Sequence, residues 1–600
     1  MTEVTRDTDM ANEPEPAQGD VLSARPPSIL QHLLAWGTLA LVVFCLGFFP
    51  LRSSTDEWWH LKTGKWIVEH GYRLPEKDIF SYTSADYHWE NHEWLSQVFM
   101  YHIYKLGEAL SFQGWKAVIF AKSILLVLCW LLLGRFLWQR CGSGRRGLMI
   151  ALFVALLAAA VGRRMFWARP PVVSNILVVF FLYVMWMHRL GRLRTLHLLV
   201  LPLLMPLWAN LHGGFLVGGM IVAAYFCGEL VEGIGLRLFA KADPAALRAK
   251  WQHCLTYLIL GVLCGLSSLI NPYGYKLYLL SSRVMDEGQL VSMLSELQPP
   301  NYRYVWAFPF MTILIGLGFI WLIARSLRRQ RPAWPPLPEM LLALFFFWQA
   351  AMHVRHLIFF GIIGAPLLAW MIREFWAEYQ NRFDRFLRIA IPVAAIWLAA
   401  WLLFFPGEAW PVIGNISRFQ PAFFAHSAVG RSTRLLLNDR YLNGLCEEPG
   451  AYPRRPVQFI LDTMPPGRMY NRNNVCGYLI WKLSPEHYRL FTDNRFDIFG
   501  GDFLIDEMII AEGVTKEEWA EAGQANRPGW MDLIEKYDIN WLFLHRNENL
   551  HRKLISNRLS GWILVYMGRE YAIWIRDTAT NRQWTKKNSR TIQAYRAGMR

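Results

Sequence analysis

Long apolar blocks separated by short polar clusters dominate the chain. Eleven of these blocks are long enough, or nearly long enough, to cross a bilayer as a helix. Prolines inside the blocks, such as Pro206 and Pro366, predict kinks, which helix bundles accommodate. The pattern predicts a polytopic α-helical membrane protein. The expected spans lie at about residues 29–50, 116–138, 148–163, 171–188, 195–211, 214–232, 252–270, 304–324, 338–352, 357–372 and 389–405.

Two longer polar stretches interrupt or follow the apolar blocks: a first extracytoplasmic loop within the predicted transmembrane domain of residues 29–406, and a region that follows that domain. In the first, residues 51–115, the pattern predicts an amphipathic helix from Glu57 to His70, a turn, and a second amphipathic helix over about 92–106. Its tryptophans suit helices that lie at a membrane interface. The second stretch, residues 407–577, alternates helical and strand patterns. It closes with a hairpin of Trp562–Met567 and Tyr571–Ile575, which predicts a small C-terminal α/β domain.

The two ends of the chain are polar. Residues 1–28 are acidic and contain proline, with no cleavable signal peptide, so we expect a disordered tail before an uncleaved anchor at Ile29–Leu51. Residues 578–600 are basic and contain no acids, which predicts a second disordered tail near anionic head groups.

The distribution of basic residues predicts the orientation. With the N-terminus inside, the five cytoplasmic loops carry eighteen Lys and Arg residues, against seven in the four later outer loops. We therefore expect a cytoplasmic N-terminus and an extracytoplasmic C-terminal domain, in the inner (cytoplasmic) membrane.

Composition agrees with a membrane protein and narrows its partners. The 600 residues are 54% hydrophobic and 18% charged, whereas soluble domains carry about a quarter charged residues. The net charge is +16, but it lies between the apolar blocks, where topology explains it, so no nucleic-acid partner is expected. The eight cysteines show no zinc-ligand spacing. Cys446 and Cys476 lie in the C-terminal region and could form a disulfide there.

An acidic pair, Asp56 and Glu57, follows the first span by a few residues. Acids at this position can cap the first amphipathic helix and complement its dipole. One of them can also act as a base or hold a divalent cation such as Mg²⁺ or Mn²⁺. The two roles are compatible, because a capped helix holds a catalytic carboxylate still.

Basic and polar residues gather on the same predicted outer face. Arginines there can contact lipid phosphate by snorkelling, or bind the phosphate of a lipid-linked substrate through their forked donors. The candidates for substrate binding are Arg163, Arg164, Arg169, Asn210, His212, His353, Arg355 and His356. Gly213 and Gly214 follow His212 and would allow close backbone approach.

Further acids lie in the first polar stretch and in the C-terminal domain. Asp78 suits a turn and is also the candidate for a second catalytic acid near Asp56. Glu90, His92 and Glu93 precede the second amphipathic helix, where capping accounts for them. Asp493, Arg495 and Asp497 alternate after an apolar segment, which favours structural salt bridges over acceptor binding. No nucleotide-binding or hydrolase motif occurs in a suitable context.

The acidic pair after the first span, the helical first loop and the C-terminal domain together resemble the GT-C glycosyltransferases. The segments Asp56–Gly64, Pro75–Thr83 and Trp89–Leu95 look like the bacterial branch similar to dolichyl-phosphate-mannose mannosyltransferases and RgtA/B/C/D. Arg169-Pro170, Trp208–Gly214 and Asp493–Asp497 resemble the same group. The bulky run Trp58-Trp59-His60 departs from many family members.

The resemblance implies a GT-C-like fold and transfer of a sugar from a polyprenyl-phosphate donor to an extracytoplasmic glycan, lipid or protein. Asp56 would be the base or cation ligand, Glu57 would support it, and the outer arginines would stabilise the leaving lipid phosphate. Two alternatives remain open: a non-catalytic scaffold of envelope polysaccharide assembly, and a transporter or flippase for a lipid-linked substrate. A transporter would more often show mid-span ionisable residues and repeated halves, and this sequence shows no repeat.

Overall fold

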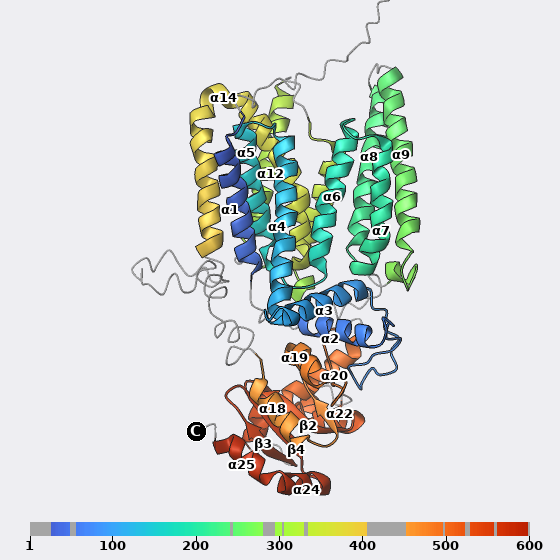
Figure 1. The fold of residues 1–600 in the computed structure, drawn as a ribbon, viewed down its shortest axis with the longest axis vertical. Helices are drawn as coiled ribbons and strands as arrows, with labels where there is room; N and C mark the ends of the chain where they lie inside the picture. Colours follow the sequence, from blue (N-terminus) through green and yellow to red (C-terminus); the bar gives the residue numbers. More distant parts are fainter. Residues whose placement is uncertain are drawn as a thin grey trace, which may run out of the picture.

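A bundle of long helices, a thin layer of two helices and a C-terminal domain follow one another along the molecule (Figure 1). The computed structural model describes residues 26–48, 56–239, 244–279, 295–302, 305–328, 334–404, 452–495, 498–521, 528–556 and 561–597. Nearly all of the predicted N-terminal tail, together with Cys446 and Asp497, lies outside these ranges.

The bundle consists of apolar helices packed side by side. Within the described ranges, eight helical segments are long and apolar enough to cross a membrane, and two halves of α14 account for two of them. The helix α7 and the helix α13 are apolar but shorter, and α9 is long but begins with polar and basic residues. The fold is therefore consistent with a polytopic membrane protein, although eleven spans are not established. The bundle helices are α1 (Ile29–Gly47), α4 (Gly114–Arg140), α5 (Arg145–Gly162), α6 (Pro171–Arg189), α7 (Val200–Leu211), α8 (Phe215–Phe239), α9 (Pro244–Ser268), α12 (Ala307–Leu327), α13 (Leu337–Met352) and α14 (Leu357–Phe404).

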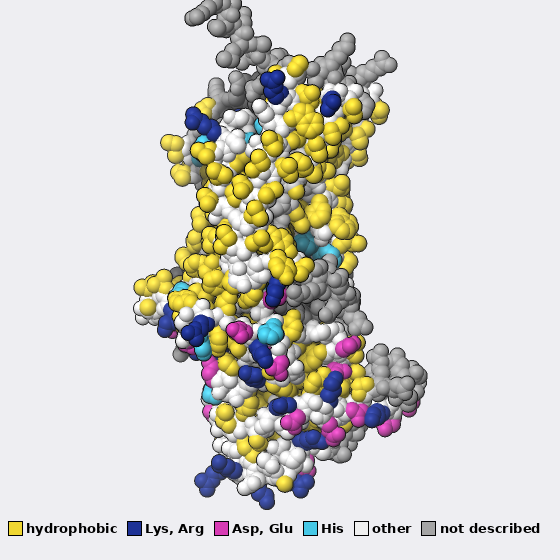
Figure 2. Space-filling model, turned by 90° about the vertical axis from the view of Figure 1, so that its right-hand side faces the viewer, with side chains coloured by type: hydrophobic (Ala, Val, Ile, Leu, Met, Phe, Trp, Pro, Cys, Tyr) yellow, Lys and Arg dark blue, Asp and Glu magenta, His cyan; other side chains and the backbone are white. Residues whose placement is uncertain are grey.

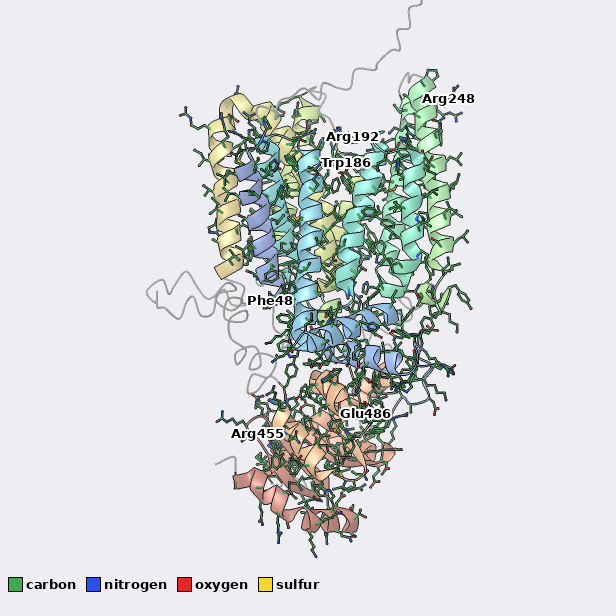
Figure 3. The ribbon with its side chains drawn as sticks, in the orientation of Figure 1. Phe48, Trp186, Arg192, Arg248, Arg455 and Glu486 are labelled. Carbon is green, nitrogen blue, oxygen red and sulfur yellow. The ribbon has the colours of Figure 1, made fainter. Side chains whose placement is uncertain are left out.

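Hydrophobic side chains cover most of the bundle surface, while charged side chains gather over the rest of the molecule (Figure 2). Side chains such as Leu255, Ile313 and Ile320 are exposed on α9 and α12. Exposed apolar surface on this scale is what a bilayer would cover. Arg192 and Arg248 lie at the end of the bundle that is far from the C-terminal domain (Figure 3). The prediction that their loops share one face, opposite that domain, agrees with this placement.

Two helices, α2 (Asp56–Glu69) and α3 (Trp94–Ala109), lie across the other end of the bundle (Figure 1). Their bounds agree with the two predicted amphipathic helices. They cross closely at Gly64, where a Cβ atom would lie 2.6 Å from the carbonyl carbon of Gln97. Every residue from Glu57 to Gly64 is buried, so this part of α2 is covered on all its sides.

The C-terminal domain is a four-stranded sheet with helices packed around it. The strand order is β1-β2-β4-β3. Strands β1 and β2 are parallel, and the other pairs are antiparallel. The predicted hairpin is present as β3 and β4. The strands are β1 (Arg468–Tyr470), β2 (Ile539–His545), β3 (Trp562–Met567) and β4 (Tyr571–Arg576). The helices are α18 (Arg454–Thr463), α19 (Cys476–Leu483), α20 (Gly501–Glu512), α21 (Lys516–Glu521), α22 (Trp530–Lys536), α23 (Asn549–Ile555), α24 (Ala579–Lys587) and α25 (Ser589–Ala597).

The last residues pack onto the domain, so the expectation of a disordered basic tail is wrong for residues 579–597. The Trp584 indole N–H donates to the carbonyl oxygen of Thr463 at 2.8 Å. Tyr595 donates its hydroxyl hydrogen to Asp462, and Ile592 is buried. The apolar side chains of α24 and α25 therefore complete the domain core, and their basic residues lie on the outside.

One hydrophobic core joins the helix layer to the C-terminal domain. Trp58 packs edge-on against Tyr452 and Tyr478, with ring centroids 5.8 and 5.9 Å apart, and lies 5.8 Å from Trp481. Trp59 lies 6.3 Å from Trp89. The expectation that these tryptophans lie at a lipid interface is wrong for Trp58, Trp59 and Trp89, because protein buries all three. The bulk of the Trp58-Trp59 run serves this packing.

A buried ion pair network fastens the same boundary. The Arg495 guanidinium donates to Asp78 and to Asp493, each at 2.6 Å, and all three side chains are buried. Asp78 also accepts hydrogen bonds from the backbone N–H groups of Phe80 and Ser81. Burial and the neighbouring Asp78 raise the pKa of Asp493, even though Arg495 opposes the rise. The predicted salt bridge is thus present between Arg495 and Asp493. Arg495 also reaches Asp78, a partner 417 positions away that was not predicted.

Replacing Arg495 tests this network. In Arg495→Gln two carboxyl groups stay buried without their guanidinium, so we expect the free energy of unfolding to fall by about 3–5 kcal/mol. A carboxyl whose pKa is raised in the folded state favours folding as the pH falls, so the deficit should shrink at acidic pH. Tryptophan fluorescence during thermal unfolding in detergent measures both effects. Arg468→Gln, at an exposed arginine of the same domain, is the control. Equal unfolding temperatures for the two variants would contradict the prediction.

Candidate functional site

Asp56 begins α2 at the point where the bundle, the helix layer and the C-terminal domain meet. Its carboxylate accepts from Arg169 at 2.9 Å and from the Asn494 amide at 3.0 Å. Arg169 follows α5 in the chain and Asn494 belongs to the C-terminal domain, so one carboxylate contacts both of the parts that flank α2. Asp56 is the first described residue after the gap at 49–55.

Arg169 has a second carboxylate partner. It donates to Glu296 at 2.7 Å, and its guanidinium lies 4.3 Å from the centre of the Trp167 ring. Burial disfavours the charged form of Arg169, but Asp56 and Glu296 outweigh it and hold the pKa of Arg169 above its ordinary value. A permanently charged group therefore lies beside Asp56.

Glu57 is buried next to Asp56, and a lysine of the bundle lies within electrostatic range of it. That lysine, Lys122 of α4, is itself buried. Its ammonium donates to the carbonyl oxygens of Gly47 and Phe166, the latter at 3.1 Å. A lysine inside an apolar helix is a recognised signal of function, so Lys122 is a candidate that the predicted site residues lack.

Glu93 lies among three histidines that come from different parts of the chain. Its carboxylate oxygens are 3.7 Å from Nε2 of His60, 3.9 Å from Nε2 of His92 and 3.5 Å from Nε2 of His212. Glu93 occupies the N-cap position of α3, but its side chain makes no capping hydrogen bond. The predicted capping role is therefore not the role of this side chain.

Hydrogen bonds fix the protonation of two of these histidines. The backbone N–H of Gly214 donates to Nδ1 of His212 at 2.8 Å, so in the neutral ring Nε2 carries the hydrogen. The amide nitrogen of Gln97 lies 3.2 Å from Nδ1 of His60. An amide N–H can only donate, so Nδ1 accepts and Nε2 carries the hydrogen of the neutral His60 ring as well. Burial lowers the pKa of His60 well below its usual range, and Arg169, His92 and His212 lower it further. Two neutral N–H groups therefore face Glu93.

The other residues predicted to bind substrate make contacts outside the cluster of Glu93 and its three histidines. Asn210 accepts from the Trp94 indole at 2.9 Å and donates to the carbonyl oxygens of Pro206 and Ile270, so it ties α3 to α7. Arg163 lies over the Trp401 ring at 4.6 Å. Arg164 lies beside it in the 3-10 turn Arg163–Met165.

The short turn Val354–His356 holds the last group. The His353 ring lies 2.7 Å from the carbonyl oxygen of Leu297, so Nδ1 carries the hydrogen. Arg355 lies within electrostatic range of His212, and the rings of His353 and His356 are 5.9 Å apart. The structure thus brings Arg355 and His212 near one another.

Asp78 belongs to the buried network with Arg495 and Asp493. The segment Asp493–Arg495 nevertheless connects the two acids, because Asn494 donates to Asp56 while Arg495 donates to Asp78. Asn494 gave no signal in the sequence.

No group of three or more His, Cys, Asp or Glu side chains arranged to hold a metal ion occurs within the described ranges. The anionic residue expected to bind a cation, Asp56, already has Arg169 beside it at 2.9 Å. The residues present do not fit a divalent cation at Asp56, and the reaction proposed for this site does not involve one.

Comparisons with known proteins returned little. No family model matches the chain, and no curated protein matches it. Among solved structures, the chain is similar to an oligosaccharyltransferase of Archaeoglobus fulgidus, crystallised with zinc and sulfate. The identity is 12%, the match covers 85% of this chain and 68% of that one, and the TM-score is 0.45. The site residues, and not this likeness, are the basis of the function proposed below.

Gly214 allows a test of the packing around His212, one of the three histidines near Glu93. A Cβ atom there would lie 2.8 Å from Nδ1 of His212 and closer still to Oγ of Ser174. We expect Gly214→Ala to displace the imidazole and to lower the free energy of unfolding by about 1–3 kcal/mol. Gly219→Ala is the matched control, because a Cβ atom at Gly219 meets nothing within 4 Å. Thermal unfolding measures the difference, and equal stability of the two variants would show that the His212 contact is not tight.

Proposed function

We propose that the protein is a membrane glycosyltransferase that moves a sugar from a polyprenyl-phosphate donor to an acceptor on the side of the C-terminal domain. The observation that supports this most is the position of Asp56. A carboxylate at the junction of bundle, helix layer and C-terminal domain is placed to meet a donor from the membrane and an acceptor from outside. The resemblance of this acidic pair to the GT-C motif agrees with the proposal.

In the proposed reaction Asp56 is the general base. The acceptor hydroxyl oxygen forms a bond to the anomeric carbon of the donor sugar, and its proton passes to the Asp56 carboxylate. The bond between the anomeric carbon and the phosphate oxygen breaks, and the electron pair leaves with the lipid phosphate. Arg169 contacts the Asp56 carboxylate at 2.9 Å and holds it in position. Glu57 supports the arrangement from its buried position.

Positive groups on the bundle would bind the lipid phosphate in this proposal. Arg163, Arg164 and Arg355 are the candidates for the phosphate, while Arg169 contacts the carboxylates of Asp56 and Glu296. His212, His353, His356 and Asn210 would position these groups and the donor sugar. The guanidinium fork suits phosphate oxygens, and it stabilises the charge that develops as the phosphate leaves.

A non-catalytic scaffold is the second candidate, and one observation favours it. The contacts of Asp56 with Arg169 and Asn494 could serve only to hold the three parts of the protein together. A transporter of a lipid-linked substrate would move the donor without breaking it. Both alternatives predict no release of lipid phosphate.

The variant Asp56→Asn separates these functions. Loss of a general base lowers the rate by about 100-fold to 10,000-fold, while the amide keeps the shape of the side chain. The measurement is release of undecaprenyl phosphate from a panel of undecaprenyl-phosphate sugars by the purified protein in nanodiscs. Glu296→Gln removes the other partner of Arg169 and should retain most activity. Full activity of Asp56→Asn would contradict the role of base, and no release by the wild-type protein from any donor would favour the alternatives.

Arg355 tests the phosphate site. We expect Arg355→Gln to raise the KM for the undecaprenyl-phosphate donor about tenfold or more, because a charge-assisted contact to phosphate is lost. Arg192→Gln, at the opposite end of the bundle (Figure 3), should leave KM unchanged. An unchanged KM in Arg355→Gln would return this residue to contact with lipid head groups.

A further inference from the structure

An open cavity of about 500 Å³ lies at the far end of α2 from Asp56. It is lined by the last turn of α2, by the loop that follows it and by Arg489 of the C-terminal domain. The cavity is thus formed by the same two parts of the protein that meet at Asp56. No residue in its lining has a role in the reaction proposed above.

Two arginines of the cavity are available to a ligand. The Asp78 carboxylate is buried and already accepts from Arg495 and from the backbone N–H groups of Phe80 and Ser81, and Lys77 pairs with Asp86 at 2.7 Å. Arg73 and Arg489 also line the cavity, and within the described part of the chain neither has a carboxylate partner. Glu76 is the remaining acid in the lining, so two guanidinium groups face one carboxylate. Unpaired guanidinium groups in a cavity suit carboxylates and phosphates, whose oxygens match the planar fork.

The cavity also has an aromatic wall with a hydrogen-bond acceptor. Trp66 and His70 stack with ring centroids 3.9 Å apart and an interplanar angle of 15°. Nδ1 of His70 lies 2.7 Å from the carbonyl oxygen of Trp66, so Nδ1 carries the hydrogen and Nε2 of the neutral ring is an acceptor. An aromatic face beside polar groups that fix orientation suits the apolar face and hydroxyls of a sugar.

We propose that this cavity binds an anionic saccharide, one that carries carboxylates or phosphates, as part of the acceptor. Arg73 and Arg489 bind the anionic groups, Trp66 packs against a sugar ring, and Nε2 of His70 accepts from a hydroxyl. The 14 residues of α2 put the cavity about 20 Å from Asp56 at 1.5 Å per residue. An extended acceptor chain could therefore lie in the cavity while its end reaches Asp56. The assignment of this ligand as acceptor rests on the proposed function, but the binding itself does not.

Binding to the purified full chain in phosphatidylcholine nanodiscs tests the proposal. The probes are trigalacturonate, glucose 6-phosphate and the neutral maltotriose, each titrated by calorimetry. We expect at least one anionic probe to bind about tenfold or more tightly than maltotriose. Arg73→Gln and Arg489→Gln should each remove most of this preference. Arg590→Gln changes the same charge at an exposed position of α25 and should leave it unchanged.

Two further variants sharpen the result. Trp66→Leu should weaken trigalacturonate and maltotriose alike, because the lost contact is with a sugar ring and not with a charge. Asp56→Asn should leave binding of all probes unchanged, so loss of transfer in that variant and loss of binding in the arginine variants report on different sites. Equal binding of anionic and neutral probes, or an undiminished preference in both arginine variants, would overturn the proposal whether or not the protein transfers sugars.

Discussion

A single buried guanidinium, that of Arg495, joins the first loop of the chain to its C-terminal domain. Arg495 lies between Asp78 of the first loop and Asp493 of its own domain, and all three side chains are removed from water. Taking a charge out of water costs several kcal/mol unless a partner of opposite charge accompanies it. Separating the first loop from the C-terminal domain would break this network, and it would expose Trp58 and Trp89 as well. The docking of the two parts is therefore cooperative, and Asn494, between Asp493 and Arg495, reaches Asp56 only because of it.

The sequence patterns predict the helices and strands well, but they do not predict which residues pack against them. The apolar runs, α2, α3 and the hairpin of β3 and β4 follow from periodicity, because each shows an apolar face or run of the right length. Periodicity cannot say what covers an apolar face. Trp58 and Trp59 have the composition of an interfacial helix, yet Tyr452, Trp481 and Trp89 cover them. The prediction of a disordered basic tail is wrong for a related reason. Its net charge suggested disorder, while the few apolar residues, Trp584, Ile592 and Tyr595, were enough to anchor two helices.

The site residues, too, can be located from the sequence, while their partners cannot. Topology alone places Asp56 and the arginines on one predicted face of the membrane, but it cannot pair them. The contact of Asp56 with Arg169 depends on how α2 packs beneath the loop between α5 and α6, and no local pattern encodes that packing. Glu93 was assigned to capping because its position suits a cap, whereas the three histidines around it come from positions 60, 92 and 212. Lys122 did carry a local signal, since a lysine is costly inside an apolar helix.

The shared core also constrains how the protein is made. A ribosome adds roughly 5–20 residues each second, so the 417 residues between Asp78 and Arg495 take about 20 to 80 s to synthesise. Through that interval the first loop lacks its partner. Trp58, Trp59 and the Asp78 carboxylate then face water, lipid or a chaperone. The surroundings of Asp56 can be completed only after the last span has been inserted, so maturation of this protein ends with a docking event outside the bilayer and not with insertion of its helices.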